Sequence, residues 1–170
     1  MKTELPFLST KRLLLFPPSL KDLSFWVALH SDPDVMKFMG GPRDKNEVKE
    51  WLETDIAHFK KHGFSMFSIV NKNNEFVGRA GLVYLDYDDA QKEIEVGYVL
   101  KKEFWNKGYA TEIVTALVSW GFKNLKIPRL VSVTRPENRK CQHILKKVGM
   151  EYKQIILFHD ETFLLYEIRK

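Results

Sequence analysis

The sequence has few of the features that mark several classes of protein. Its 170 residues include one cysteine, Cys141, so no intrachain disulfide can form and a cysteine-based metal site is not expected. A single cysteine suits a reducing compartment, and we expect a cytoplasmic protein. No apolar run approaches the roughly 20 residues of a membrane span. Residues 1–12 hold an acid and a proline where a signal peptide needs an unbroken apolar stretch, so none is expected.

Strong charge bias and the common nucleotide motifs are also missing. Lys and Arg number 27 and Asp and Glu 22, a net charge of +5, and the basic residues are dispersed among acids. Nucleic acid is therefore not the expected partner. Neither the glycine-rich loop of P-loop proteins nor the G-x-G-x-x-G dinucleotide fingerprint occurs. His30, His58, His62 and His143 are expected on helix surfaces or ends without metal-like spacing, so we expect no metal.

The periodicity of apolar residues predicts one α/β (α+β) domain over residues 1–170, without repeats or linkers. The expected order is β-α-α-β-β-β-α-β-α-β-β, which gives a mixed, mostly antiparallel sheet of about seven strands flanked by about four helices. The strand at 93–100 and the strand at 129–134 enclose a helix at 113–122, and this arrangement predicts a parallel crossover. Expected strands cover residues 12–16, 64–70, 75–85, 93–100, 129–134, 151–158 and 162–168. The other expected helices cover 20–27, 45–61 and 138–149.

The junction "FWNKGYATE", residues 104–112, is the most informative stretch. A helix that begins after a tight loop presents unpaired N–H groups and a partial positive charge, which together favour an anion such as phosphate. Asn106 tolerates left-handed dihedral angles, Gly108 has no side chain to obstruct an anion, and Ala110 keeps the first helical turn thin. Taken alone, the junction fits an anion site and a simple chain turn equally well.

The surrounding residues resemble the GCN5-related N-acetyltransferase (GNAT) family. Residues 93–122 and 129–152 carry the likeness, and Trp105 to Ala110 occupy the family signature Arg/Gln-x-x-Gly-x-Gly/Ala. The pattern is most similar to the RimJ/RimL-type branch, which acetylates the N-termini of ribosomal proteins. Asn106 departs from the Gly usual in that branch, and Cys141 stands where Ser is common. Leu145 takes the place of a Tyr that serves some members as general acid.

The resemblance implies an acetyl-CoA-dependent N-acetyltransferase that passes the acetyl group directly to a primary amine. The acceptor would be a protein N-terminal α-amine, such as that of a ribosomal protein, or a small-molecule amine, and the enzyme a monomer or homodimer. Phe38, Met39 and Gly40 would line the acceptor side. The coenzyme would contact Tyr98, Val99, Trp105, Asn106, Lys107, Gly108, Tyr109, Ala110, Thr111 and Asn138.

Two residues are candidates for the proton transfers. Glu95 shares a strand face with Gly97 and Val99, and it matches the family's glutamate, so it is the candidate general base, acting through water. The alternative is a cross-strand ion pair or a solvated side chain. Cys141 would protonate or hydrogen-bond the leaving thiolate, and the alternative is a small buried helix residue. Other functions left open are a non-catalytic acyl-CoA-binding sensor and a ribosome- or RNA-docking module.

Overall fold

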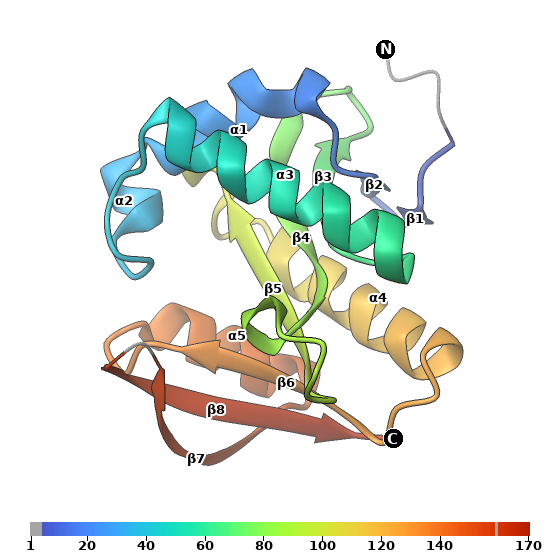
Figure 1. Cartoon of the computed structure of the whole chain (residues 1–170), viewed down its shortest axis with the longest axis vertical. Coiled ribbons are helices and arrows are strands. Elements are labelled where there is room, and N and C mark those ends of the chain that lie inside the picture. The colour runs from blue at the N-terminus through green and yellow to red at the C-terminus, as the bar shows by residue number, and fades with distance from the viewer. Residues whose placement is uncertain (1–4, 159) are drawn as a thin grey trace.

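A computed structural model describes residues 5–158 and 160–170 (Figure 1). The described residues form one sheet in the order β1-β2-β3-β4-β5-β6-β8-β7, in which every neighbouring pair is antiparallel except β5 and β6. The strands are β1 (Leu8–Ser9), β2 (Leu13–Phe16), β3 (Met66–Asn71), β4 (Phe76–Tyr84), β5 (Ile94–Leu100), β6 (Arg129–Thr134), β7 (Glu151–Phe158) and β8 (Glu161–Arg169).

Five α-helices and three 3₁₀ turns lie between the strands of the described chain. The helices are α1 (Leu23–His30), α2 (Pro33–Met36), α3 (Lys45–His62), α4 (Tyr109–Asn124) and α5 (Arg139–Val148). The 3₁₀ turns are η1 (Leu20–Asp22), η2 (Leu85–Tyr87) and η3 (Lys102–Phe104). Within the described residues, none of the helices is both long enough and apolar enough to cross a membrane.

The predicted fold class and the order of its elements are confirmed. The sequence missed only β1 and α2, because two strand residues and four helical residues are too few to show a periodicity. The sheet consequently has eight strands rather than about seven. His159, in the turn expected between the last two strands, lies outside the described residues.

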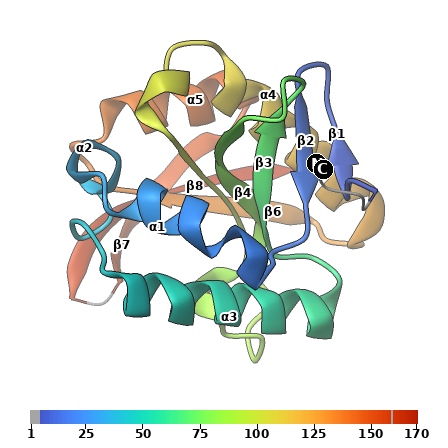
Figure 2. The same ribbon diagram turned by 90° about the horizontal axis from the view of Figure 1, so that it is seen from above.

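Helices cover both faces of the sheet, with α1 and α3 on one side and α4 and α5 on the other (Figure 2). Each pair encloses its own apolar core. On the first side Trp26, Leu29, Val48 and Leu52 pack against Met66, Phe76, Val83 and Val99. On the second side the core includes Ile113, Val114, Leu117, Leu145, Leu82, Val96 and Leu100. This double coverage leaves the strand ends as the places where a ligand can reach the sheet.

Local signals set the boundaries of α3 and α5 close to the expected ranges, whereas α1 begins three residues later and α4 four residues earlier than expected. Asp44 and Glu47 form a capping box at the start of α3, and Gly63 ends that helix in a left-handed conformation. The side chain of Asn138 accepts from the Cys141 N–H and caps α5, which Gly149 terminates. Because these caps act within one or two turns, they can be read from sequence.

The parallel strands β5 and β6 separate almost at once. The two strands diverge in Figure 1, and their register is a single pair, Glu95 with Val131. Beyond it the N–H of Val133 turns to the side chain of Glu95, whose Oε1 accepts at 3.4 Å. The carboxyl ends of the two strands are thus splayed.

Candidate functional site

The loop before α4 has the backbone geometry of an anion site. Asn106 and Gly108 have φ angles of 59° and 76°, in the left-handed region, as their residue types allow. Gly108 is the N-cap residue of α4, and Asn106, Lys107 and Gly108 are all exposed. Successive amides in such a conformation, together with the start of a helix, form a concavity that favours anions.

The predicted coenzyme residue Trp105 is tied to the end of the preceding strand. Its indole N–H donates to the carbonyl of Leu100 at 2.8 Å. Phe104, next to it, is buried against the core. The side chain of Trp105 therefore anchors the loop, and its backbone is the part that remains for a ligand.

Arg12, which the sequence did not suggest as a site residue, fixes the loop through hydrogen bonds. Arg12, between β1 and β2, donates from Nη1 to the carbonyl of Lys107 at 2.8 Å and from Nε to Glu112 at 2.6 Å. Its guanidinium also lies 4.5 Å from the ring centre of Tyr109. A Cβ atom at Gly108 would come within 3.3 Å of Arg12 Nη2, so the missing side chain also makes room for the guanidinium.

Glu95 lies at the point where β5 and β6 part. Cross-strand pairs join Glu95 to Val83 and Val99 to Arg79, which confirms that residues 95, 97 and 99 share a face. Val99 belongs to the core on the α1/α3 side, so this face opens toward those helices. The side chain is only half-buried, yet desolvation raises the pKa of Glu95 to about 7, against the opposing effects of the Val133 N–H and of Arg79.

Cys141 lies in the first turn of α5, opposite the splayed end of β5. The hydroxyls of Thr134 and Tyr98 interact with its thiol. Burial raises the pKa of Cys141 despite these two groups, so the thiol is protonated at neutral pH. The structure thus brings Tyr98 of β5 together with Asn138 and Cys141 at the start of α5. Leu145 is fully buried in the core, and its side chain has no proton to donate.

The predicted acceptor residues follow the short helix α2. Met39 packs against the α1/α3 core, Phe38 is half-buried, and Gly40 is exposed with a φ angle of 84°. Asp34 of α2 forms an ion pair with Lys102 of η3. The acceptor segment is therefore linked to the segment that leads into the junction loop.

A buried polar network under the α1/α3 helices corrects the expectation for two histidines. His30 is fully buried and His58 is 6% exposed, so neither is a surface residue. Desolvation, with help from Arg79, lowers the pKa of His30 to about 3. The neutral ring accepts from Arg79 Nε at Nε2 (2.9 Å), and its Nδ1 donates to the Trp26 carbonyl (2.7 Å).

The same network contains a buried carboxylate. Asp55 is fully buried, and its Oδ1 accepts from the hydroxyls of Tyr87 at 2.6 Å and Ser65 at 3.1 Å. Its Oδ2 lies 3.6 Å from Arg79 Nη1. An Arg inside the apolar run "FVGRAGLV" could have signalled this network, since a charge in a central strand needs a partner.

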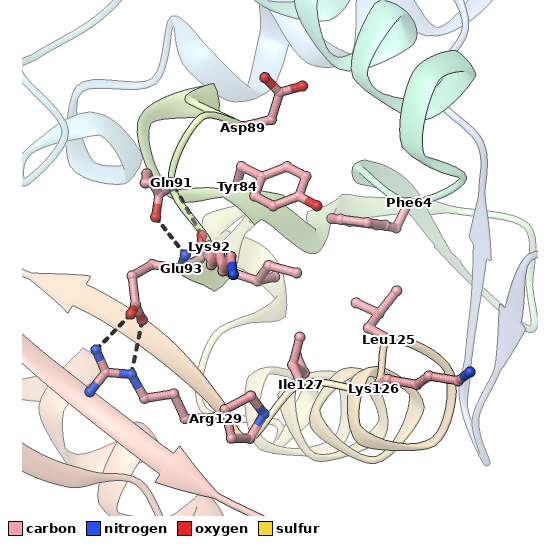
Figure 3. Close-up of a pocket in the computed structure, with 12 residues that line it drawn as sticks. Phe64, Tyr84, Asp89, Gln91, Lys92, Glu93, Leu125, Lys126, Ile127 and Arg129 are labelled. Atoms are coloured by element: carbon pink, nitrogen blue, oxygen red, sulfur yellow. Dashed lines mark hydrogen bonds and ion pairs between the residues drawn. The ribbon is translucent and has the colours of Figure 1, made fainter.

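A separate cavity of about 530 Å³ lies at the other end of β5 (Figure 3). Phe64, Tyr84 and Ile127 line it, and an ion pair between Glu93 and Arg129 crosses its edge. None of the predicted site residues lines this cavity. Among the described residues there is no cluster of three or more His, Cys, Asp or Glu side chains that could hold a metal.

Comparison with known proteins identifies the fold. The Bacillus subtilis proteins YkkB and YnaD, the latter named as an N-acetyltransferase, are 29% and 28% identical over 140 and 148 residues. These matches cover 82% and 84% of this chain and 81% of each relative. A crystal structure of an acetyltransferase from Agrobacterium tumefaciens has a TM-score of 0.86 and 26% identity, covering 100% of this chain and 98% of that one.

The RimJ/RimL branch suggested by the sequence is not singled out by these comparisons. A RimL structure in complex with coenzyme A has a TM-score of 0.79 at 14% identity, covering 96% of this chain and 97% of that one, which shows the shared fold alone. The family itself is shown by a sequence profile. The profile described as "Acetyltransferase (GNAT) domain" matches residues 12–151, and the chain therefore belongs to the GNAT family of N-acetyltransferases.

Proposed function

We propose that this N-acetyltransferase binds acetyl-CoA across the splayed ends of β5 and β6 and transfers the acetyl group directly to a primary amine. The observation that carries the proposal is the single β5–β6 pair, Glu95 with Val131, beside the exposed start of α4. Ligands of α/β sheets bind outside the carboxyl ends of strands, where the connections diverge. The backbone edge of Tyr98 and Val99 suits the pantetheine arm as an added strand.

The diphosphate would bind the main-chain amides of residues 106–111. Their exposure and the two left-handed residues support this placement. Each charge-assisted hydrogen bond contributes roughly 1.5–3 kcal/mol before desolvation is subtracted. Asn138, whose side-chain Oδ1 accepts from the Cys141 N–H and caps α5, would contact the pantetheine arm.

Glu95 would take the proton of the amine through a water molecule. A base with a pKa of about 7 is half ionised near neutral pH, and so can both accept and release a proton there. A terminal α-amine, with a pKa near 8, needs roughly 1.4 kcal/mol for deprotonation at pH 7, whereas a lysine needs about 4.6 kcal/mol. An α-amine is therefore the favoured acceptor, and a ribosomal protein N-terminus is one such amine.

Cys141 would supply the proton that the leaving thiolate needs. The amine nitrogen forms its bond to the thioester carbonyl carbon, the C–S bond breaks, and the electron pair goes to sulfur. The Cys141 thiol, protonated at neutral pH, donates to that sulfur and regains its proton from solvent. Tyr98, whose hydroxyl interacts with the thiol, would hold the group in place.

The test is a mass-spectrometric screen of amines with acetyl-CoA and the full chain. The panel contains short peptides with free N-termini, a polyamine, an aminoglycoside and free amino acids. We expect acetylated product from at least one class, with release of free CoA thiol. Coenzyme binding without product from any amine would favour the sensor, and binding that falls steeply with salt but ignores acetyl-CoA would favour an RNA-docking role.

A further inference from the structure

Arg12 is a charged side chain that reaches the junction loop from a distant part of the sequence, and the proposed chemistry does not use it. It lies 95 positions before Lys107, whose carbonyl oxygen accepts from Arg12 Nη1 at 2.8 Å. Although 41% of its side chain is exposed, its contacts fix its orientation.

The guanidinium is held by a carboxylate with both oxygens engaged. Oε2 of Glu112, in the first turn of α4, accepts from Arg12 Nε at 2.6 Å. Oε1 accepts from the backbone N–H of Arg12 at 2.8 Å and from the Thr10 hydroxyl at 2.6 Å. Thr10 in turn accepts from the N–H of Leu13 at 3.0 Å, which closes the turn between β1 and β2. The turn and the helix therefore form one rigid unit behind the loop.

The Lys107 carbonyl, which accepts from Arg12, belongs to the same peptide unit as the Gly108 N–H. All peptide bonds of the described chain are trans, so the Lys107 C=O and the Gly108 N–H point in opposite directions. With the oxygen drawn toward Arg12, the N–H faces away from it. The residues on either side of Lys107 both have left-handed φ angles, 59° at Asn106 and 76° at Gly108. Glycine restricts rotation of the adjoining peptide plane very little, so the loop alone does not fix this direction.

We propose that Arg12 is a positioning residue for the coenzyme. By holding the Lys107 carbonyl it keeps the Gly108 N–H directed at the diphosphate, and it prevents the peptide from turning its oxygen toward the anion. This inference rests on the proposed placement of the diphosphate at residues 106–111. It assigns Arg12 no contact with the reacting atoms, and so predicts an effect on coenzyme binding rather than on the chemical step.

The experiment compares Arg12→Met and Arg12→Lys with the control variant Arg169→Met. Like Arg12→Met, the control removes one positive charge, but it does so at an exposed arginine at the C-terminal end of β8. Steady-state kinetics are measured with acetyl-CoA and with S-acetylpantetheine, which lacks the diphosphate. We expect Arg12→Met to raise KM for acetyl-CoA about tenfold or more, the loss of one hydrogen bond to a charged group, with kcat nearly unchanged. Its kcat/KM with S-acetylpantetheine should equal that of the wild type, and Arg169→Met should behave as wild type with both donors.

Arg12→Lys separates charge from geometry. A single ammonium group cannot hold the Lys107 carbonyl and the Glu112 carboxylate in the same fork, so KM for acetyl-CoA should rise here too. If Arg12→Met does not fold, as shown by thermal unfolding, this variant carries the whole test.

Three results would overturn the inference and leave the proposed function standing: an unchanged KM for acetyl-CoA in both Arg12 variants, wild-type behaviour of Arg12→Lys alone, or equal losses with both acetyl donors. The last would mean that Arg12 supports the fold as a whole. A wild-type enzyme that uses both donors equally well would instead refute the placement of the diphosphate, and the inference with it.

Discussion

Replacing Glu95 by Gln should make the enzyme slower and the protein more stable at the same time. The substitution keeps the shape of the side chain and an oxygen that can accept from the Val133 N–H, but it removes the titrating group. If Glu95 is the general base, turnover at pH 8 should fall by about 10²-fold or more. Coenzyme affinity should hardly change, because the proposed diphosphate site lies on the loop before α4.

The stability gain follows from the direction of the pKa shift. The folded protein raises the pKa of Glu95 from 4.5 to about 7, mainly by desolvation. Below pH 4 the carboxyl of Glu95 is protonated in both the folded and the unfolded state, so its raised pKa does not lower the free energy of unfolding. As the pH rises from 4.5 to 7, Glu95 ionises in the unfolded chain before it ionises in the folded protein. The free energy of unfolding therefore falls, by up to about 3 kcal/mol for the full shift in pKa. Since the side chain of Glu95 is partly exposed, we expect Glu95→Gln to raise the free energy of unfolding by about 2 kcal/mol.

Urea unfolding at pH 4 and pH 8, together with a pH–rate profile, measures both effects. The variant should unfold at higher urea than the wild type at pH 8, and the difference should nearly vanish at pH 4. Wild-type kcat/KM should rise through a pH near 7, and that rise should be lost in the variant. An unaltered pH–rate profile would remove Glu95 from the role of base, and a stability difference that ignores pH would refute the raised pKa.

Other substitutions test neighbouring parts of the site. Asp55→Asn should lower the free energy of unfolding by about 3–5 kcal/mol in urea titrations, because it leaves Arg79 buried without its ion pair, and a loss below 1 kcal/mol would contradict this. Cys141→Ala should lower kcat about tenfold or more, and Cys141→Ser should keep more activity because a hydroxyl still donates, so equal rates for the two would exclude proton donation. Gly108→Ala places a Cβ at a φ of 76° and 3.3 Å from Arg12 Nη2. Calorimetry should show weaker acetyl-CoA binding, and the backbone strain should lower the free energy of unfolding by about 1–2 kcal/mol. Wild-type affinity would refute the loop as the binding site.

Much of the local structure of the candidate site could be predicted because its signals are local. The alternation that puts Glu95 and Val99 on one face depends only on strand geometry. The left-handed φ angles of Asn106 and Gly108 follow from their residue types, and Asn138 caps α5 within a single turn. The four-residue α2 escaped prediction because one turn contains no repeat to detect.

The sequence by itself determined the order of the longer elements, the fold class, the motif at the start of α4 and hence the family. These features follow from short-range steric and hydrogen-bonding preferences. Only the tertiary structure decided that Arg12 reaches Lys107 and that His30 and Arg79 meet in the core. It also decided that desolvation raises the pKa of Glu95. The physical reason is that a buried or half-buried charge is set by what packs around it, and here those neighbours come from segments far apart in the chain.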